Sequence, residues 1–98
     1  MIPSLAQLVD KLATELPDAL SGPQGTWSHR GRPFAVLTPS GIELALDAAI
    51  AAAATRTPDT APSSRGTEWV RFNPRELDGH AVDRLTAWFE LAYRRAAE

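Results

Sequence analysis

Cysteine is absent from the 98 residues of this chain. Without it the protein has no disulfide framework, no thiolate nucleophile and no cysteine-based metal site. The two histidines, His29 and His80, have no partners at the spacing of a zinc motif. We therefore predict that the protein holds no metal and no cofactor, and that the histidines lie at the surface or its rim.

Catalytic motifs are lacking as well. None of the serines stands in a Gly-x-Ser-x-Gly elbow, and the segment 22–25 is not followed by the Gly-Lys-Ser/Thr of a phosphate loop. The acidic residues are scattered, with no pair that suggests a shared pocket. An enzyme is therefore the least favoured interpretation.

An excess of basic residues is also missing, because 10 basic and 12 acidic residues give a formal net charge of −2. Dedicated, sequence-independent nucleic-acid-binding proteins usually carry a basic surplus, since phosphate neutralisation supplies most of their affinity. The charge balance argues against that class but leaves room for a local basic patch. Arginine outnumbers lysine nine to one, a bias that favours a GC-rich, bacterial source.

Long apolar runs are missing too. No run approaches the roughly 20 apolar residues that a membrane-spanning helix needs. The segment Met1 to Leu16 has no basic start and is interrupted by charged side chains, unlike a signal peptide. We therefore expect a cytoplasmic protein with no membrane partner.

A chain of this length and with 44% apolar residues predicts one globular domain. Ser4 and Gln7 match a capping box at the start of a helix expected from about Leu5 to Glu15. Its apolar residues repeat at helical spacing, and Pro17 prevents its continuation. Turn-forming residues follow at 21–25.

Three short runs of strand-forming residues come next, joined by three-residue loops that contain glycine, which predicts an antiparallel meander. The runs are Thr26 to His29, Pro33 to Thr38 and Ile42 to Leu46. In the third run, alternate apolar residues predict one face on the core, with Glu43 and Ala45 on the other. An alanine-rich helix from Ala48 to about Arg56 is expected after it, with Asp47 as its N-cap.

The last third of the chain predicts a strand followed by a long helix. The strand is expected at Glu68 to Phe72, with Val70 and Phe72 facing the core. Asp78 would cap a helix that runs to about Ala97. The preceding segment, Thr57 to Arg65, is the longest expected loop and the one expected to be most mobile.

The first candidate binding feature is the hairpin tip at Arg30-Gly31-Arg32, with Trp27 and His29 beside it. A basic, glycine-containing tip next to an aromatic residue can bind phosphate or enter a nucleic-acid groove. The same residues can also form an ordinary solvated turn.

The second candidate feature is Trp69 with Arg71, which share the strand face away from the core. Such a pair can stack on a ring and contact an anion. The alternative is that a helix or the long loop covers Trp69 while Arg71 extends into solvent.

The order of these segments resembles two groups of small bacterial proteins. The resemblance lies in a strand Arg32–Leu37, an Ile/Leu strand, an Ala-rich helix, the segment Thr67–Phe72 and a terminal helix with Trp88–Tyr93. One group carries the label "luciferase domain", and the other is the MmcQ/YjbR-like group.

The resemblance covers roughly Trp27 to Ala96. Likeness to the YjbR-like group implies a CyaY-like α+β fold, and nucleic-acid binding has been suggested for that group on structural analogy. The "luciferase domain" label does not establish luciferase chemistry. That group also tends to carry a histidine-rich strand, where this chain has Ile42 to Leu46. The matching positions are Phe34, Trp69, Phe72 and Tyr93, and packing is the role that they imply.

The prediction as a whole is one α+β domain over residues 1–98, of order αβββαβα. An antiparallel sheet of about four strands would carry the first and third helices on one face. The expected function is a small non-enzymatic binding module for an anionic ligand or nucleic acid. Its expected binding residues are Trp27, His29, Arg30, Arg32, Trp69 and Arg71. The alternative is a protein–protein interaction domain, self-associating as a homodimer, with no small ligand.

Overall fold

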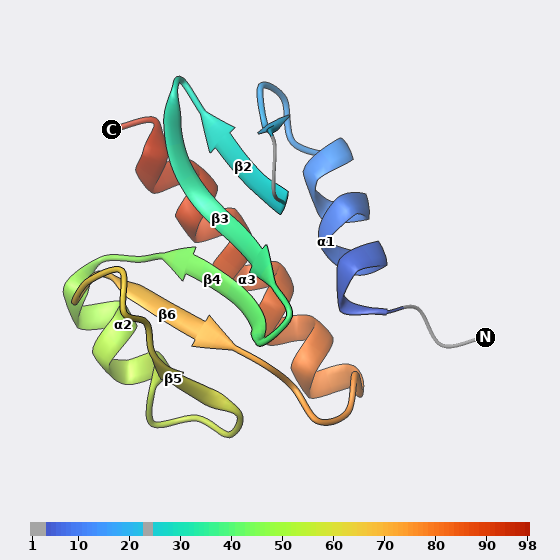
Figure 1. The fold of residues 1–98 in the computed structure, drawn as a ribbon, viewed down its shortest axis with the longest axis vertical. Coiled ribbons are helices and arrows are strands. Elements are labelled where there is room, and N and C mark those ends of the chain that lie inside the picture. Colours follow the sequence, from blue (N-terminus) through green and yellow to red (C-terminus); the bar gives the residue numbers. More distant parts are fainter. Residues whose placement is uncertain (1–3, 23–24) are drawn as a thin grey trace.

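The structure, a computed structural model, describes residues 4–22 and 25–98. Helices and strands follow one another as α1 (Leu5–Thr14), β1 (Leu20–Ser21), β2 (Thr26–His29), β3 (Arg32–Thr38), β4 (Gly41–Ala45), α2 (Ala48–Ala54), β5 (Thr60–Pro62), β6 (Trp69–Phe72) and α3 (Gly79–Ala96). The strands form one antiparallel sheet in the order β1-β2-β3-β4-β6-β5 (Figure 1). The α+β class with an antiparallel sheet is confirmed.

The sheet has six strands where the sequence predicted about four. The two additional strands, β1 and β5, are the short edge strands of the sheet, in segments rich in turn-forming residues. Their pairing comes from backbone hydrogen bonds to a neighbouring strand, which leave little pattern in the side chains. The segment 57–65, expected to be a loop, therefore contains β5. Ser21 belongs to β1, and Pro23 and Gln24 of the expected turn lie outside the described residues.

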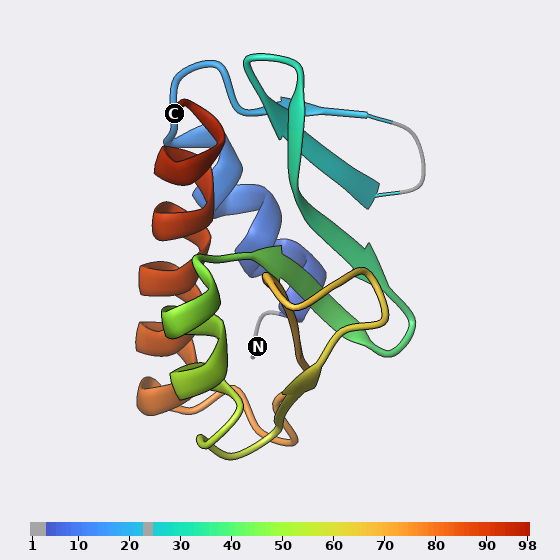
Figure 2. The same cartoon turned by 90° about the vertical axis from the view of Figure 1, so that its left-hand side faces the viewer.

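The helices lie on one side of the sheet (Figures 1 and 2). Buried residues of all three helices join one apolar core with the inner face of the sheet, among them Val9 of α1, Ala51 of α2 and Leu85 of α3. The first and third helices were expected there, and α2 joins them because alanine side chains let it approach the sheet closely. We call the opposite sheet face the outer face.

The helix caps follow the sequence in two cases of three. Ser4 and Gln7 form the expected capping box, and Asp78 accepts a hydrogen bond from the backbone N–H of Ala81. Asp47 precedes α2 but makes no capping hydrogen bond with its side chain. Its carboxylate instead accepts a hydrogen bond from Arg95, near the end of α3. A long-range partner therefore replaces the local one.

Alternation along the central strands decides which side chains enter the core. Ile42 and Leu44 of β4 pair with Phe72 and Val70 of β6, and all four are fully buried. The pattern fails in β3, where a register shift against β2 leaves Phe34 as an extra residue. Phe34 and its neighbour Ala35 are consequently both buried in the core.

Candidate functional site

Two of the expected binding residues lie in the core. The indole of Trp27 is 6% exposed and packs edge-on against Phe89 of α3. His29 is 5% exposed, and its ring stacks on Tyr93 with centroids 4.0 Å apart. The Nδ1 atom of His29 also lies 2.9 Å from the carbonyl oxygen of Tyr93. Both side chains therefore join β2 to α3, and His29 is not at the surface or its rim.

Arg30 and Arg32 lie at the expected hairpin tip and are exposed. Arg30 and Gly31 form a two-residue loop with φ of 54° and 78°, the left-handed conformation that a tight β-hairpin requires at both positions. Arg30 projects at the tip. Arg32, the first residue of β3, lines a pocket instead.

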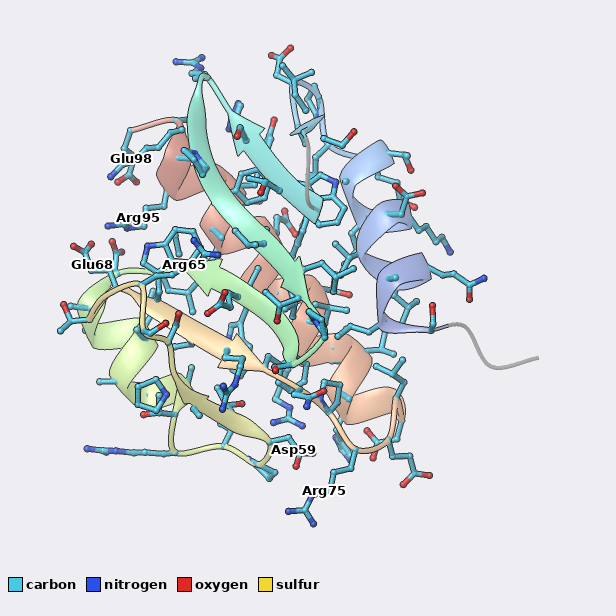
Figure 3. The ribbon with its side chains drawn as sticks, viewed as in Figure 1. Asp59, Arg65, Glu68, Arg75, Arg95 and Glu98 are labelled. Carbon is cyan, nitrogen blue, oxygen red and sulfur yellow. The ribbon has the colours of Figure 1, made fainter. Side chains whose placement is uncertain are left out.

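This pocket, which we call the arginine pocket, lies beside the N-terminal end of β6 and has a volume of about 350 Å³. Its walls come from β3, the end of β4, the loop 65–68, β6 and the last turns of α3. The lining residues are Arg32, Pro33, Ala45, Arg65, Gly66, Thr67, Glu68, Trp69 and Arg95. Figure 3 shows Arg65, Glu68 and Arg95 gathered at this side of the molecule.

The loop 63–68 forms one wall of the arginine pocket because Glu43 holds it against the outer face. The Ser63 hydroxyl donates to Glu43 Oε1 over 2.6 Å, and Arg65 Nε donates to Oε2 over 2.8 Å. At its far end the loop is fixed by a 2.7 Å bond from the backbone N–H of Leu46 to the carbonyl of Glu68. The loop is therefore tied to β4 through Glu43 and to the residue that follows β4, Leu46.

Glu43 is 8% exposed and is negatively charged at neutral pH. Burial by itself raises the pKa of this carboxyl group. The hydrogen bonds from Ser63 and Arg65, with the positive charges of Arg65 and Arg71, outweigh burial and bring the pKa below its ordinary value. Both carboxylate oxygens have partners, so Glu43 is structural, and it engages Arg65 through Nε alone.

Trp69 is half-buried, and the guanidinium carbon of Arg65 lies 5.6 Å from the centre of its ring. This is a cation–π arrangement in which the loop covers part of the indole. The expected pair of Trp69 and Arg71 does not form one site. Trp69 lines the arginine pocket with Arg32, while Arg71 is exposed further along β6 and lines a different pocket.

The charges of the arginine pocket are unevenly paired. Arg95 is paired with Asp47 and Glu68, and Arg65 with Glu43. Within residues 4–22 and 25–98, Arg32 forms no ion pair with an acidic side chain, and its Nη1 atom donates a 3.5 Å hydrogen bond to the main-chain oxygen of Glu98. The positive charge of Arg32 therefore has no acidic side chain paired to it, and the same lining includes the aliphatic residues Pro33 and Ala45. Guanidinium groups bind carboxylate and phosphate oxygens with two parallel hydrogen bonds.

Sequence reasoning missed Glu43, Arg65 and Arg95 as parts of the site. Glu43 was placed on the outer side of its strand, but nothing nearby in sequence indicated a cation 22 residues away. Arg95 stands in the last turn of α3, where a cation is favoured by the helix dipole whether or not it lines a pocket. An acidic residue at an outward position of a central strand was the one available signal, since such a charge needs a partner when it is covered.

The described residues hold no group of histidine or acidic side chains arranged to bind a metal ion. Within the same residues, no helix combines the length and apolarity needed to cross a membrane. Comparison of the chain with models of protein families, with curated proteins and with solved structures finds no match.

Proposed function

We propose that this protein is a small non-enzymatic binding module whose arginine pocket takes an anionic ligand. The observation that supports this most directly is the meeting of Arg32, Arg65 and Trp69, from three separate segments, in one pocket on the outer face. The guanidinium of Arg32 has no acidic side chain as a partner, and Glu43 engages that of Arg65 through Nε. Two such groups in one pocket make a site for a carboxylate or phosphate group. The apolar parts of the ligand would lie against Pro33 and Ala45.

The ligand of this proposal is a small organic anion rather than a long nucleic acid. The pocket holds about 350 Å³, a volume near the lower end for small-molecule sites. Glu68 lies in its wall, and a carboxylate at that place disfavours a continuous run of phosphates. A single-stranded oligonucleotide is therefore the competing ligand that the experiment must include.

The test is a calorimetric titration at low salt with citrate, pyrophosphate and a short oligothymidine, on the natural protein and two variants. Arg32→Ala should weaken binding of the small anion about tenfold, the cost of one charge-assisted hydrogen bond. Arg30→Ala is the matched control, because Arg30 is exposed in the same hairpin but does not line the pocket.

Equal losses of affinity in Arg32→Ala and Arg30→Ala would indicate diffuse electrostatic attraction to the hairpin tip and contradict binding in the arginine pocket. Tighter binding of the oligonucleotide, with affinity falling steeply as salt rises, would favour the nucleic-acid alternative. No binding of any of the three probes would remove this proposal.

A second candidate function is self-association through the outer strand β1. Leu20, in this strand, is 67% exposed, and β1 pairs with β2 on one side only. An apolar side chain on an unpaired strand edge is a place where a second copy can add. Light scattering over a wide concentration range tests this, with Leu20→Lys expected to abolish any dimer. A constant monomer mass would exclude it.

The resemblance to the "luciferase domain" and YjbR-like groups stays a proposal as well. It is supported by the shared succession of helix, meander, helix, strand and helix. The strands β1 and β5 lie outside that succession. The proposed anion site does not depend on membership of either group.

A further inference from the structure

We propose that a second pocket, centred on Arg71, binds a tetrahedral oxyanion of the phosphate type independently of the arginine pocket. It has a volume of about 550 Å³ and lies toward the C-terminal end of β6. Its walls come from the β3–β4 turn, β5, β6 and the segment after β6. The lining residues are Pro39, Ser40, Asp59, Thr60, Ala61, Arg71, Asn73 and Arg75. We call it the Arg71 pocket.

The frame of the Arg71 pocket is held by Asp59. Its backbone carbonyl accepts a 2.9 Å hydrogen bond from the N–H of Asn73. Its carboxylate accepts a 3.2 Å hydrogen bond from the N–H of Arg75 and forms an ion pair with Arg75 Nε, also at 3.2 Å. Figure 3 shows Asp59 and Arg75 side by side at this edge of the molecule. The turn before β5 and the segment after β6 are thereby joined.

The charge of the Arg71 pocket is positive. Asp59, the one carboxylate in its wall, is engaged by Arg75. Within the described parts of the chain, Arg71 forms no ion pair. Its cross-strand partner Glu43 has both oxygens engaged by Ser63 and Arg65. The guanidinium of Arg71 is therefore available to an anion from solvent.

The lining of the Arg71 pocket also includes neutral polar side chains. The Ser40 hydroxyl and the Asn73 carboxamide make no side-chain hydrogen bond to another residue that the structure describes. The Thr60 hydroxyl is engaged by the carbonyl of Pro58 and the hydroxyl of Thr57. A guanidinium with a hydroxyl and an amide N–H offers donors in several directions, which suits the oxygens of a tetrahedral anion better than a flat carboxylate. Because the pocket is open to water, binding should be weak and sensitive to salt.

The experiment is an NMR titration of the isotope-labelled protein with inorganic phosphate at low ionic strength. Saturable shifts are expected for the backbone amides of Ser40, Thr60 and Asn73. Arg71→Gln should reduce the affinity reported by these amides at least about fivefold, while Arg71→Lys retains part of it. Arg56→Gln, a change at an exposed arginine outside both pockets, should leave the affinity unchanged.

Binding at the two pockets is distinguished by testing each variant at the other pocket. Arg32→Ala should leave the shifts of the Arg71 pocket intact, and Arg71→Gln should leave binding at the arginine pocket intact. Absent or non-saturable shifts, or equal affinity in Arg71→Gln with a natural amide spectrum, would overturn the inference. Should Arg71→Gln perturb the spectrum broadly, Ser40→Ala, a smaller change in the exposed turn, tests the same site. The proposed function can fail without this inference failing, because different amides report each pocket.

Discussion

The carboxylate of Glu43 and the guanidinium of Arg65 form an ion pair with a 2.8 Å bond across 22 residues of sequence. Glu43 lies on the outer face of the sheet, in the central strand β4. A carboxylate exposed to water there would need no partner, but the loop 63–68 covers Glu43 and supplies one. The bond draws the loop 63–68 over that face and creates the wall of the arginine pocket. One residue thus connects the packing of the sheet to the shape of the candidate site.

We predict that Glu43→Gln lowers the free energy of unfolding by about 1.5–3 kcal/mol, the range for hydrogen bonds to a charged group. Arg65 is 43% exposed, so water screens the pair and the loss should lie toward the lower end. A glutamine side chain has one oxygen and one NH₂ group, so it cannot accept the hydrogen bonds of both Ser63 and Arg65 as the two carboxylate oxygens do. Denaturant unfolding at neutral pH measures the change, and a loss below experimental error would contradict it.

The same pair predicts a dependence of stability on pH. Because the pKa of Glu43 is lowered from 4.5 in the folded protein, the unfolded state binds a proton first as the pH falls. The contribution of Glu43 to stability is therefore complete above pH 4.5 and is lost as the pH falls from there through the folded pKa. Unfolding curves across this acid range should show a smaller pH-dependent loss in Glu43→Gln than in the natural protein. Equal losses would assign the acid sensitivity to other groups.

Gly41 is predicted to tolerate no side chain. It has φ of 124°, and a Cβ there would lie 2.5 Å from the carbonyl oxygen of Phe72 and 2.8 Å from Cβ of Asn73. Gly41→Ala should cost at least about 2 kcal/mol, because a clash with backbone adds to the strain of the dihedral angle. Gly31→Ala is the control, because Gly31 also has a positive φ, 78°, but a Cβ added there would have no atom within 4 Å. Its cost should be about 1 kcal/mol. Similar thermal midpoints for the two variants would contradict the steric account.

Phe89 should be among the most costly residues to truncate. Its ring is fully buried and packs edge-on against Phe34, with centroids 5.3 Å apart. Phe89→Ala should destabilise the protein by about 3–5 kcal/mol. Leu91, on the same helix and 38% exposed, is the matched control and should lose less than about 1 kcal/mol as alanine. Chemical denaturation compares them, and equal losses would mean that α3 packs differently.

Tyr93 connects three segments, and its hydroxyl is predicted to contribute separately from its ring. The hydroxyl donates to the carbonyl of Pro17, and the ring stacks on His29. Tyr93→Phe should therefore cost about 1 kcal/mol, while Tyr93→Ala, which also removes the stack, should cost clearly more. Thermal unfolding of the three proteins tests this order. Equal stability of Tyr93→Phe and the natural protein would show that the hydrogen bond has no net effect.

The central strands and the helix starts could be predicted because their signals are local. Alternation in Ile42–Leu46 and in Glu68–Phe72 assigned the core face correctly, and Ser4 and Asp78 act as the caps that their positions indicated. The expected helices reached one or two residues too far, to Glu15 and Arg56, because helix ends depend on the chain that follows. The outer strands were missed because a strand of two or three residues has no pattern to recognise.

The candidate site was predictable only in part. Arg32 and Trp69 were identified one by one, from residue type and position, and the fold brings them into one pocket. Trp27 and His29 also combine an aromatic ring with a polar group, yet their packing against Phe89 and Tyr93 of α3 buries them. No local signal distinguishes these two outcomes, because burial depends on elements more than fifty residues away.

The order of residues alone thus determined the class of fold, the inner face of the sheet and the absence of cysteine chemistry. The first two follow from interactions between residues within a few positions of one another, and the third follows from composition. Only the tertiary structure decided which cations remain unpaired. Charge pairing acts through space, and the partners of Glu43, Asp47 and Glu68 come from distant turns and helices.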